Sequence, residues 1–427
     1  MIKPGDILGM NARQRLYAPL NSKTAASICA SKFATKVLLT NKGIPTAEIF
    51  GILATNEDIN EFDWHNLTKN FVIKPTNGNA GKGVIAFRTI QPDGQHWLDT
   101  LGKVWDLDDI KLHCFDILEG QYSTYGSQHN VIIEERIPIH TKLRKYSYKG
   151  TPDVRVVVFN HVPVMALLRL PTPESEGRAN QSQGAIGVGI DMATGITTYA
   201  VANKNVPIKY LPGTKRKLNG IKIPFWSRLL RTAVEASDAA NLVFSGIDLF
   251  VHEEKGPMVV ELNANPGLSI QNANRAGLRR RLDRVEDLNV RNAEHGVKIS
   301  QALFAESFAD KIKGEEGLQI ISPKETVSVY IDQKQTVDAL ALVNTGRARS
   351  AIASDFASQL GLIDIDDLLW FQPIAGEGKV PVVEVRFRLK GQKITTAMLV
   401  SKSLNGSKHK LEIGRRDLVN FLVGQDS

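Results

Sequence analysis

The chain has 427 residues, of which 42% are hydrophobic and 23% are charged, with two cysteines and a formal net charge of +8. This composition is typical of a globular protein with two or three domains, and it excludes a disordered, collagen-like or disulfide-rich chain. No apolar run approaches the roughly 20 residues that cross a bilayer, and the first residues lack the apolar core of a signal peptide. We therefore expect a cytoplasmic protein with no membrane partner.

The positive charge is compatible with two classes of partner. Lys215–Lys217 and Arg279–Arg281 are basic clusters, but both are short and neither contains an aromatic residue. Nucleic acid is therefore the less favoured partner. An enzyme with an anionic substrate is the favoured interpretation.

The first part of the chain, 1–310, predicts a mixture of helices and strands. Apolar residues at helical spacing predict one helix over 23–41. The other expected elements are strands at 71–74 and 130–137, a hairpin of strands 153–160 and 163–170, and an amphipathic helix at 224–241. A crowd of Lys, Glu and Gly before Pro323 predicts a linker over 311–324, and short strands over 325–427 predict a small β domain.

A glycine-rich segment follows the first expected strand directly. The strand delivers Lys74, and the loop after it holds Gly78, Gly81 and Gly83. Glycine lets backbone amides approach phosphate oxygens closely, and a lysine adds a positive charge. The segment is not a Walker-type loop, because Lys82 is followed by glycine and no hydroxyl is placed for Mg²⁺. A glycine-rich hairpin turn without a ligand explains the segment about equally well.

Two apolar segments on either side of a polar turn, 252–257, predict a second hairpin. Alternation along its second strand places Glu261, Asn263 and Asn265 on one face. A turn at the middle of the polar segment would place Asp248 opposite Glu261. Carboxylate and amide oxygens with open positions suit Mg²⁺ shared with substrate phosphates, and we favour this site over a polar strand face in water.

The strand at 130–137 is apolar and then runs into Glu134 and Glu135, which we expect to be exposed. Its backbone amide and carbonyl groups suit recognition of an adenine edge. An ordinary edge strand is the alternative.

These motifs occur together in the order found in a known family. They are Lys32, Lys74 with its glycine loop, Glu134–Glu135, Asp153–Arg155, Asp248 and Glu261–Gly267. The set resembles the ATP-grasp carboxylate–amine ligases over about residues 1–305, and it looks closest to the α-L-glutamate ligase-like branch, which 178–191 also resembles. The resemblance implies an α+β ATP-grasp fold with ATP and Mg²⁺ as cofactors. It also implies an acyl phosphate that an amino acid such as glutamate attacks, with release of ADP and phosphate.

The resemblance further implies roles for individual residues. Nucleotide binding falls to Lys32, Lys74, Gly78, Gly81, Gly83, Glu134 and Glu135, metal binding to Asp248, Glu261 and Asn263, and substrate binding to Arg178, Asn180 and Asn265. Arg155 and Arg169 are the candidate catalytic residues, because a guanidinium group matches phosphoryl and carboxylate geometry. A strand-surface ion pair is the alternative for both arginines, and a polar loop is the alternative for Arg178 and Asn180.

The C-terminal part of the chain resembles a second family. Val337–Gly346, the glycine-rich turn at 374–378 and Lys410–Leu418 follow the order of retropepsin-like aspartic peptidases, and look especially like the small domains described as ATP-dependent zinc proteases. Asn344, Thr345 and Gly346 stand where that pattern has Asp-Thr-Gly. An amide cannot share the proton that aspartic proteolysis needs, so we expect a peptidase fold without peptidase activity. Neither a His-x-x-x-His motif nor a cysteine pair supports zinc there.

Three functional hypotheses follow from these patterns. The first is an ATP- and Mg²⁺-dependent ligase whose substrates are an amino acid and a peptide or small carboxylate. The second is an ATP-binding scaffold whose C-terminal domain binds a peptide by strand addition or forms a homodimer. The third is an active protease, which Asn344 disfavours. A purely structural C-terminal domain is about as well supported as a binding one.

Overall fold

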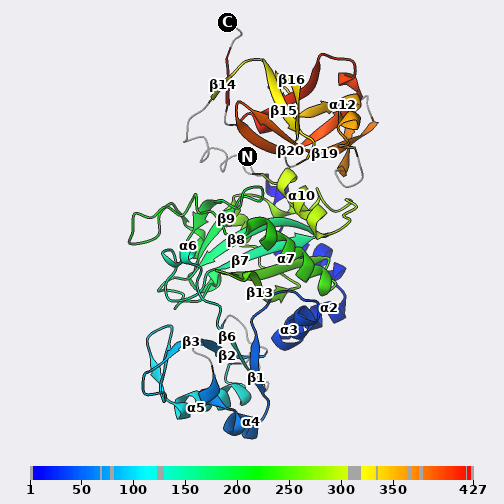
Figure 1. Ribbon diagram of the computed structural model, residues 1–427. Helices are drawn as coiled ribbons and strands as arrows, with labels where there is room; N and C mark the ends of the chain where they lie inside the picture. The colour runs from blue at the N-terminus through cyan, green and yellow to red at the C-terminus, as the bar shows by residue number, and fades with distance from the viewer. Residues whose placement is uncertain are drawn as a thin grey trace. The chain divides into compact units, whose positions relative to one another are not determined.

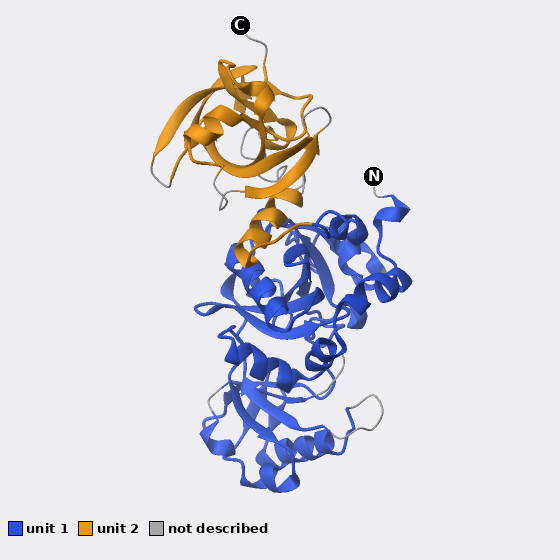
Figure 2. Cartoon of the chain, turned by 90° about the vertical axis from the view of Figure 1, so that its right-hand side faces the viewer, with its two compact units in different colours: residues 1–287 blue, residues 288–427 orange. Residues whose placement is uncertain are grey.

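The computed structural model describes residues 3–67, 70–76, 81–122, 129–305, 319–332, 335–363, 368–374, 378–419 and 421–424. The chain forms two compact units, residues 1–287 and 288–427, which Figure 2 shows in blue and orange. The boundary lies earlier in the sequence than the predicted boundary at 310. Most of the predicted linker, 311–318, lies outside the described residues. Within the described ranges, no helix is both long enough and apolar enough to cross a membrane.

The N-terminal segment of the first unit consists of short helices. They are η1 (Pro4–Asp6), α1 (Met10–Ala12), a π-helical turn η2 (Arg13–Tyr17), η3 (Ala18–Leu20), α2 (Lys23–Ala30) and α3 (Lys32–Asn41). The prediction of one helix over 23–41 is wrong, because the chain becomes extended at Ser31. The Ser31 hydroxyl accepts a hydrogen bond from the Ala34 amide at 3.2 Å and thereby caps α3. The break places Lys32 at the first position of a new helix.

The first sheet of this unit has six strands in the order β1-β6-β2-β3-β4-β5. Its strands are β1 (Ile49–Leu53), β2 (Phe71–Pro75), β3 (Ile85–Ile90), β4 (Trp97–Asp99), β5 (Val104–Trp105) and β6 (Val131–Glu135). Helices α4 (Asn56–Glu61) and α5 (Leu107–Leu118) pack with the sheet around a buried core (Figure 1). The short helix η4 (Trp64–Asn66), between α4 and β2, contributes Trp64 to this core. The predicted strands at 71–74 and 130–137 are therefore confirmed.

The second sheet has seven strands in the order β11-β10-β9-β8-β7-β12-β13. The strands are β7 (Asp153–Phe159), β8 (Val162–Leu170), β9 (Ile186–Ile190), β10 (Thr197–Val201), β11 (Pro207–Ile208), β12 (Phe244–His252) and β13 (Gly256–Asn263). The associated helices are α6 (Thr141–Arg144), η5 (Gln181–Gln183), η6 (Asn203–Asn205), α7 (Trp226–Ala239), α8 (Ile270–Asn274) and α9 (Leu278–Leu282). All nine residues of β8 are buried, so both faces of the sheet are covered there.

The two predicted hairpins are confirmed in this second sheet. Strands β7 and β8 pair through Asn160 and His161, which both have positive φ angles, as the tight hairpin turn requires. Strands β12 and β13 pair with Asp248 opposite Glu261. The predicted amphipathic helix at 224–241 is α7.

The second unit is mostly β. Its elements are α10 (Ala293–Leu303), β14 (Gln319–Ile321), β15 (Lys324–Tyr330), β16 (Thr336–Asn344), β17 (Ala351–Ala353), α12 (Ser354–Gln359), β18 (Leu368–Ile374), β19 (Gly378–Leu389), β20 (Gln392–Ser401), η7 (Lys402–Leu404), β21 (His409–Gly414), η8 (Arg415–Asp417) and β22 (Phe421–Val423). Strands β15-β16-β21-β17-β20-β19 pair in that order, and β15 also pairs with β19, which closes them into a barrel. An α+β unit followed by a mostly-β domain agrees with the predicted fold class, whereas the retropepsin-like identity expected of the second domain stays a prediction.

Candidate functional site

The β12–β13 hairpin carries the acidic residues at the centre of the candidate site. Asp248 and Glu261 are register partners. Asn263 follows on the same strand face, and its amide Nδ2 donates to the carbonyl of Gly246 at 3.4 Å, which leaves its Oδ1 available to a cation. Asn265 lies beyond the end of β13 and is exposed, so it does not continue the strand face as predicted. The backbone has already bent away at that point.

Asp248 belongs to a buried chain of four charged side chains. Both of its oxygens accept from Arg155, with Nε–Oδ1 and Nη2–Oδ2 distances of 2.7 Å. Arg169 Nη2 donates to the same Oδ2 at 2.7 Å, and Arg169 also makes a two-pronged pair with Asp153. Burial alone would raise the pKa of Asp248, but the two guanidinium groups outweigh burial and hold the pKa well below its ordinary value. The structure shows both arginines in ion pairs, with Arg169 buried rather than at a strand surface, and a catalytic role for either arginine stays a prediction.

Glu261 has different surroundings. Its side chain is half-buried, and within the described ranges it makes no hydrogen bond and no ion pair. The residues that fit a cation are therefore Glu261 and the Oδ1 of Asn263, whereas Asp248 would first have to give up an arginine. In keeping with this, the described residues contain no group of three or more His, Cys, Asp or Glu side chains that could hold a metal by themselves.

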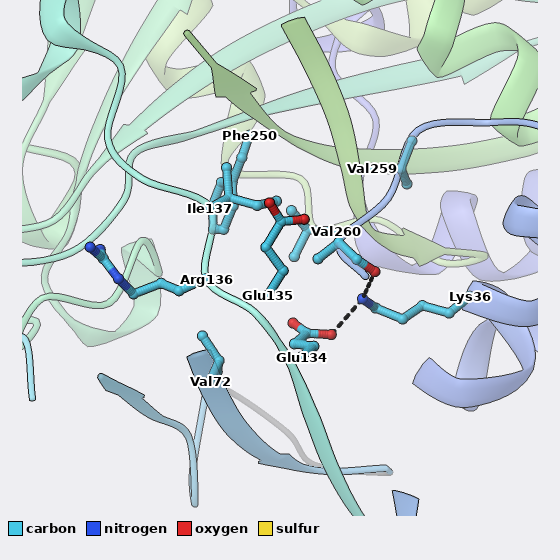
Figure 3. Close-up of a pocket in the computed structure, with 10 residues that line it drawn as sticks. Lys36, Val72, Glu134, Glu135, Arg136, Ile137, Phe250, Val259 and Val260 are labelled. Atoms are coloured by element: carbon cyan, nitrogen blue, oxygen red, sulfur yellow. Dashed lines mark hydrogen bonds and ion pairs between the residues drawn. The ribbon is translucent and has the colours of Figure 1, made fainter. Parts of the chain in front are cut away.

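A cluster of lysines around Glu134 lies on the facing elements α3, β2 and β6. Lys74 Nζ lies 2.7 Å from Glu134 Oε1. Lys36 Nζ lies 2.5 Å from Glu134 Oε2 (Figure 3). The expectation that Glu134 is exposed is wrong, because these two lysines pair with it and it is buried. Glu135 is half-buried and pairs with Lys255 at 2.6 Å. The strand thus ends inside the molecule rather than at its surface.

Lys32 connects this cluster to the hairpin. Burial lowers the pKa of Lys32; Lys74 adds to the shift, while Glu261 and Glu134 oppose it. Burial likewise raises the pKa of the neighbouring Cys29 thiol to about 11, and the charge of Glu261 contributes to the shift. Lys32 therefore lies within the electrostatic reach of both the acidic hairpin and the lysine cluster, as a residue that bridges phosphates would have to.

The described part of the glycine-rich loop is anchored to α5. Gly83 has a φ of +71°, and a side chain there would collide with the ring of Tyr122. The Gly83 carbonyl lies 3.0 Å from His113 Nε2, and the Tyr122 hydroxyl lies 3.2 Å from His113 Nδ1. A carbonyl only accepts, so Nε2 carries the proton and Nδ1 accepts from the tyrosine. Gly81 has a φ of +74° and lies beside Arg178, and Gly78 lies outside the described residues.

A pocket opens where β6 leaves the first sheet (Figure 3). Its cavity volume is about 40 Å³, and its lining is mainly apolar: Lys36, Ala47, Val72, Glu134, Glu135, Arg136, Ile137, Phe250, Val259 and Val260. The backbone amides of Glu135 and Arg136 already donate to Glu48 and Asn70. The wall of the pocket therefore combines apolar side chains from both sheets with a strand end whose amides are already bonded within the protein.

Comparison with known protein families decides what this arrangement represents. Residues 11–287 match the model of the sugar-transfer associated ATP-grasp family, which covers well over half of the chain and ends where the first compact unit ends. The chain belongs to this family. The ATP-grasp part of the sequence-based expectation is thereby confirmed. Placement in the α-L-glutamate ligase-like branch stays a prediction.

Three of the solved structures that match the chain are two ligases and a synthetase. ATP-grasp ligase PsnB with its minimal precursor is 15% identical, with 62% of this chain and 60% of that chain covered and a TM-score of 0.34. D-alanine–D-alanine ligase from Bacillus anthracis complexed with ATP is 16% identical, with 70% and 71% covered and a TM-score of 0.36. D-cycloserine synthetase DcsG is 14% identical, with 63% and 74% covered and a TM-score of 0.38. The chain thus spans about 60% of the PsnB chain, and no curated protein matches the sequence.

In this ATP-grasp unit, the residues expected to bind substrate are partly occupied by their own loop. Asn180 Oδ1 accepts from the Ser182 amide at 3.1 Å and from its hydroxyl at 2.9 Å. Arg178 pairs with Glu176 at 3.1 Å and lies against Gly81. Arg178 is therefore next to the glycine-rich loop. Asn180 instead stabilises its own loop through its bonds to Ser182.

The barrel that follows the ATP-grasp unit presents Asn344 at the end of β16. Asn344 Oδ1 accepts from the amides of Gly346 at 3.1 Å and Arg347 at 3.2 Å, so the Asn344–Thr345–Gly346 turn is closed on itself. Its Nδ2 donates to Glu412 at 3.4 Å. Part of the predicted flap, 375–377, lies outside the described residues, and the retropepsin-like identity of the barrel stays a prediction.

Sequence reasoning missed two residues of the site. The sequence patterns gave no role to Lys36, which lies one helical turn after Lys32 on the buried face of α3. Its spacing of four residues from Lys32, which places both lysines on one helix face, is the signal that could have identified it. Asp153, the partner of Arg169, was recognised only as part of a motif, because its partner is known only once the β7–β8 register is known.

Proposed function

We propose that the protein is an ATP- and Mg²⁺-dependent ligase that joins a carboxylate to the amine of an amino acid such as glutamate. The observations that carry the proposal are the buried cluster of Lys74, Lys36 and Glu134 and the hairpin with Glu261, whose charges both act on Lys32. Nucleotide phosphates need cations and a shared metal; the lysines would supply the cations, and Glu261 with Asn263 would hold the metal.

The reaction would proceed in two steps. A carboxylate oxygen of the first substrate attacks the γ-phosphorus of ATP, the bond to the β,γ-bridging oxygen breaks, and ADP leaves. The amine nitrogen of the second substrate then attacks the acyl carbon, phosphate leaves with the former carboxylate oxygen, and the nitrogen loses a proton. Positioning and charge neutralisation are the main contributions of the protein in such chemistry.

The described residues have defined parts in this scheme. The apolar pocket at β6 receives the base, and Lys32 and Lys74 bind phosphates. Glu261 and Asn263 would hold Mg²⁺, which neutralises phosphate charge when bound. Gly81 and Gly83 bring their backbone close to the phosphates, with Gly83 held by His113. We assign Asp248 to the metal site only if Arg155 releases it.

Arg155 is the better placed of the two candidate catalytic arginines. Its Nε and Nη2 are committed to Asp248, and its Nη1 lies by Gly267, in the turn after β13. Nη1 is therefore the group that can contact a carboxylate or transferred phosphoryl group. Arg169 is held by both Asp153 and Asp248, and its part is to keep Asp248 and Arg155 in place.

The proposal is tested by the release of ADP from purified protein supplied with ATP, Mg²⁺ and pooled amino acids and carboxylates, with products identified by mass spectrometry. Turnover that depends on both an amine and a carboxylate is the expected result. An absence of turnover across a broad panel would refute the proposal if Glu261→Ala and Asp248→Ala also left ATP binding unchanged.

A second function, an ATP-binding scaffold, is favoured by one observation. Asp248 is fully neutralised by two arginines, so the protein could hold a nucleotide without assembling a complete metal site. The barrel would then bind a peptide or a second copy of the chain. Stoichiometric retention of ATP without its consumption would distinguish this function from ligation.

A further inference from the structure

Glu134 is a counter-ion shared by two buried lysines. Its Oε1 pairs with Lys74 and its Oε2 pairs with Lys36, at 2.7 and 2.5 Å. The side chain of Glu134 is 9% exposed, and those of Lys36 and Lys74 are 3% and 7% exposed. Each lysine thus occupies a different carboxylate oxygen, and one of them can leave without displacing the other.

Lys74 has two competing partners once a nucleotide is bound. It comes from the strand that leads into the glycine-rich loop, and in this structure its ammonium group is committed to Glu134. Moving Lys74 onto a phosphate would leave the carboxylate of Glu134 buried, and a buried charge without a partner is strongly unfavourable. If Glu134 had no other cation, it would therefore compete with the phosphate for Lys74.

Lys36 removes this competition. Besides Glu134, its ammonium group donates to the carbonyl of Ala47 at 2.7 Å, which fixes it at the wall of the pocket. We infer that Lys36 is a positioning residue that keeps Glu134 neutralised, so that Lys74 is free to bind the phosphates of a nucleoside di- or triphosphate. This inference rests on the proposed function only for the identity of the anion.

The charges of the cluster agree with this role. The charges of Glu134 and Glu261 act on Lys32, Lys36 and Lys74, and Glu135, which also acts on Lys36, pairs with Lys255. The lysines thus exceed these carboxylates by one positive charge. Burial lowers the pKa of Lys36 to about 8, although the charge of Glu134 opposes that shift. Lys36 and Lys74 share one carboxylate and repel each other, and transfer of Lys74 to a phosphate reduces that repulsion.

A purely structural role for Lys36 is the competing explanation, because its bond to Ala47 also ties α3 to the chain before β1. The two roles differ in one respect. A structural tie acts whether or not Glu134 is charged, whereas the proposed role vanishes when Glu134 is made neutral. The test is therefore a double-mutant cycle on Lys36 and Glu134.

The experiment measures the affinity of the full chain for ADP with Mg²⁺ by calorimetry, in wild type, Lys36→Met, Glu134→Gln and the double variant. Lys36→Met should weaken ADP binding about tenfold, since one charge-assisted phosphate contact is lost. Adenosine, which has no phosphate, serves as the comparison ligand, and its affinity should change less than about twofold. Lys42→Met removes an exposed lysine just after the same helix and should leave ADP binding unchanged.

The decisive comparison is made in the neutral background. Lys36→Met added to Glu134→Gln should change ADP affinity by less than about threefold, because no carboxylate then competes for Lys74. Neither Glu134→Gln nor the double variant contains a buried carboxylate without a partner. Their ADP affinities can therefore be compared even if Lys36→Met alone does not fold. A tenfold loss of ADP affinity in both backgrounds would overturn the inference and would support a structural role for Lys36. Unchanged ADP binding by Lys36→Met would also overturn it, as would a wild-type protein that does not bind ADP. If ADP binds as expected but no ligation is ever found, the proposed function fails and the inference stands.

Discussion

Asp248 and Glu261 face each other across the β12–β13 hairpin, yet their carboxylates have opposite surroundings. Both oxygens of Asp248 accept hydrogen bonds from arginines. Glu261 has no ion pair in the described part of the chain and acts on Lys32 and Cys29 only through its charge. The carboxylate that is open to a cation is therefore Glu261.

Replacement of Glu261 tests this difference directly. We expect Glu261→Gln to reduce Mg²⁺-dependent ADP release at least about 100-fold, because the charged ligand of the hairpin is lost. The free energy of unfolding should change little, since the side chain is half-buried and unpaired within the described residues. Glu254→Gln, in the exposed turn of the same hairpin, is the control and should retain wild-type turnover. Full activity of Glu261→Gln would contradict a metal site on this strand.

The Asp153–Arg169 pair should contribute strongly to stability. Asp153→Asn leaves the buried guanidinium of Arg169 with one carboxylate in place of two, and we expect the free energy of unfolding to fall by about 3 kcal/mol. The matched control is Asp238→Asn, whose partner His161 is exposed, and there the loss should stay below about 1 kcal/mol. Urea denaturation of both variants provides the measurement. Equal losses would show that burial of the Arg169 pair has no energetic consequence.

Gly83 of the glycine-rich loop can be compared with Gly94, a glycine of similar φ in the turn between β3 and β4. Gly83 and Gly94 have φ angles of +71° and +69°, but a Cβ at Gly83 would lie 2.7 Å from the ring of Tyr122, whereas Gly94 is in open space. Gly94→Ala should cost about 1 kcal/mol of unfolding free energy through its backbone. Gly83→Ala should cost about 1–3 kcal/mol more and should weaken ATP binding as well. Thermal denaturation and ATP titration measure the two effects, and identical behaviour of the two variants would refute the contact with Tyr122.

The reactivity of Cys29 reports on the charge of Glu261. Burial, together with that charge, raises the pKa of the Cys29 thiol from 9.0 to about 11, so its thiolate fraction at pH 8 should be about 100-fold below that of an unperturbed thiol. The rate of alkylation should therefore continue to rise up to about pH 11. In Glu261→Gln the midpoint of the pH dependence of the alkylation rate should move to lower pH, because a negative charge that disfavours the thiolate is removed. An unchanged midpoint would place Glu261 too far from Cys29 to act on it.

The barrel should not cleave peptides. Asn344 has no proton to share as an acid would, and its Oδ1 is occupied by the amides of its own turn. Asn344→Asp would place a carboxylate next to Glu412, so we expect it to lower the free energy of unfolding by about 1 kcal/mol at pH 7, and by less at pH 4. Cleavage of a peptide library by wild type, abolished in Asn344→Ala, is the result that would revive a protease function.

Sequence patterns predicted the parts of the site that depend on local rules. The alternation of residues and one polar turn were enough to place Asp248 opposite Glu261. The break at Ser31 was missed because serine is tolerated inside a helix and also caps one, and only the bond from the Lys32 amide to Thr76 decides between the two. The burial of Glu134 was missed for a related reason. Its partner Lys74 lies 60 residues away, so their contact depends on how the sheet and α3 pack.

The ion-pair chain of Asp153, Arg169, Asp248 and Arg155 contains two negative and two positive charges, so its net charge is zero. The long-range electrostatic attraction between these four side chains and an approaching polyanion is therefore small. Long-range steering of a nucleotide falls to Lys32, Lys36 and Lys74, whose three positive charges exceed the two negative charges of Glu134 and Glu261. Association with ATP should accordingly slow as ionic strength rises, and neutralising one of these lysines should flatten that dependence more than neutralising Arg155.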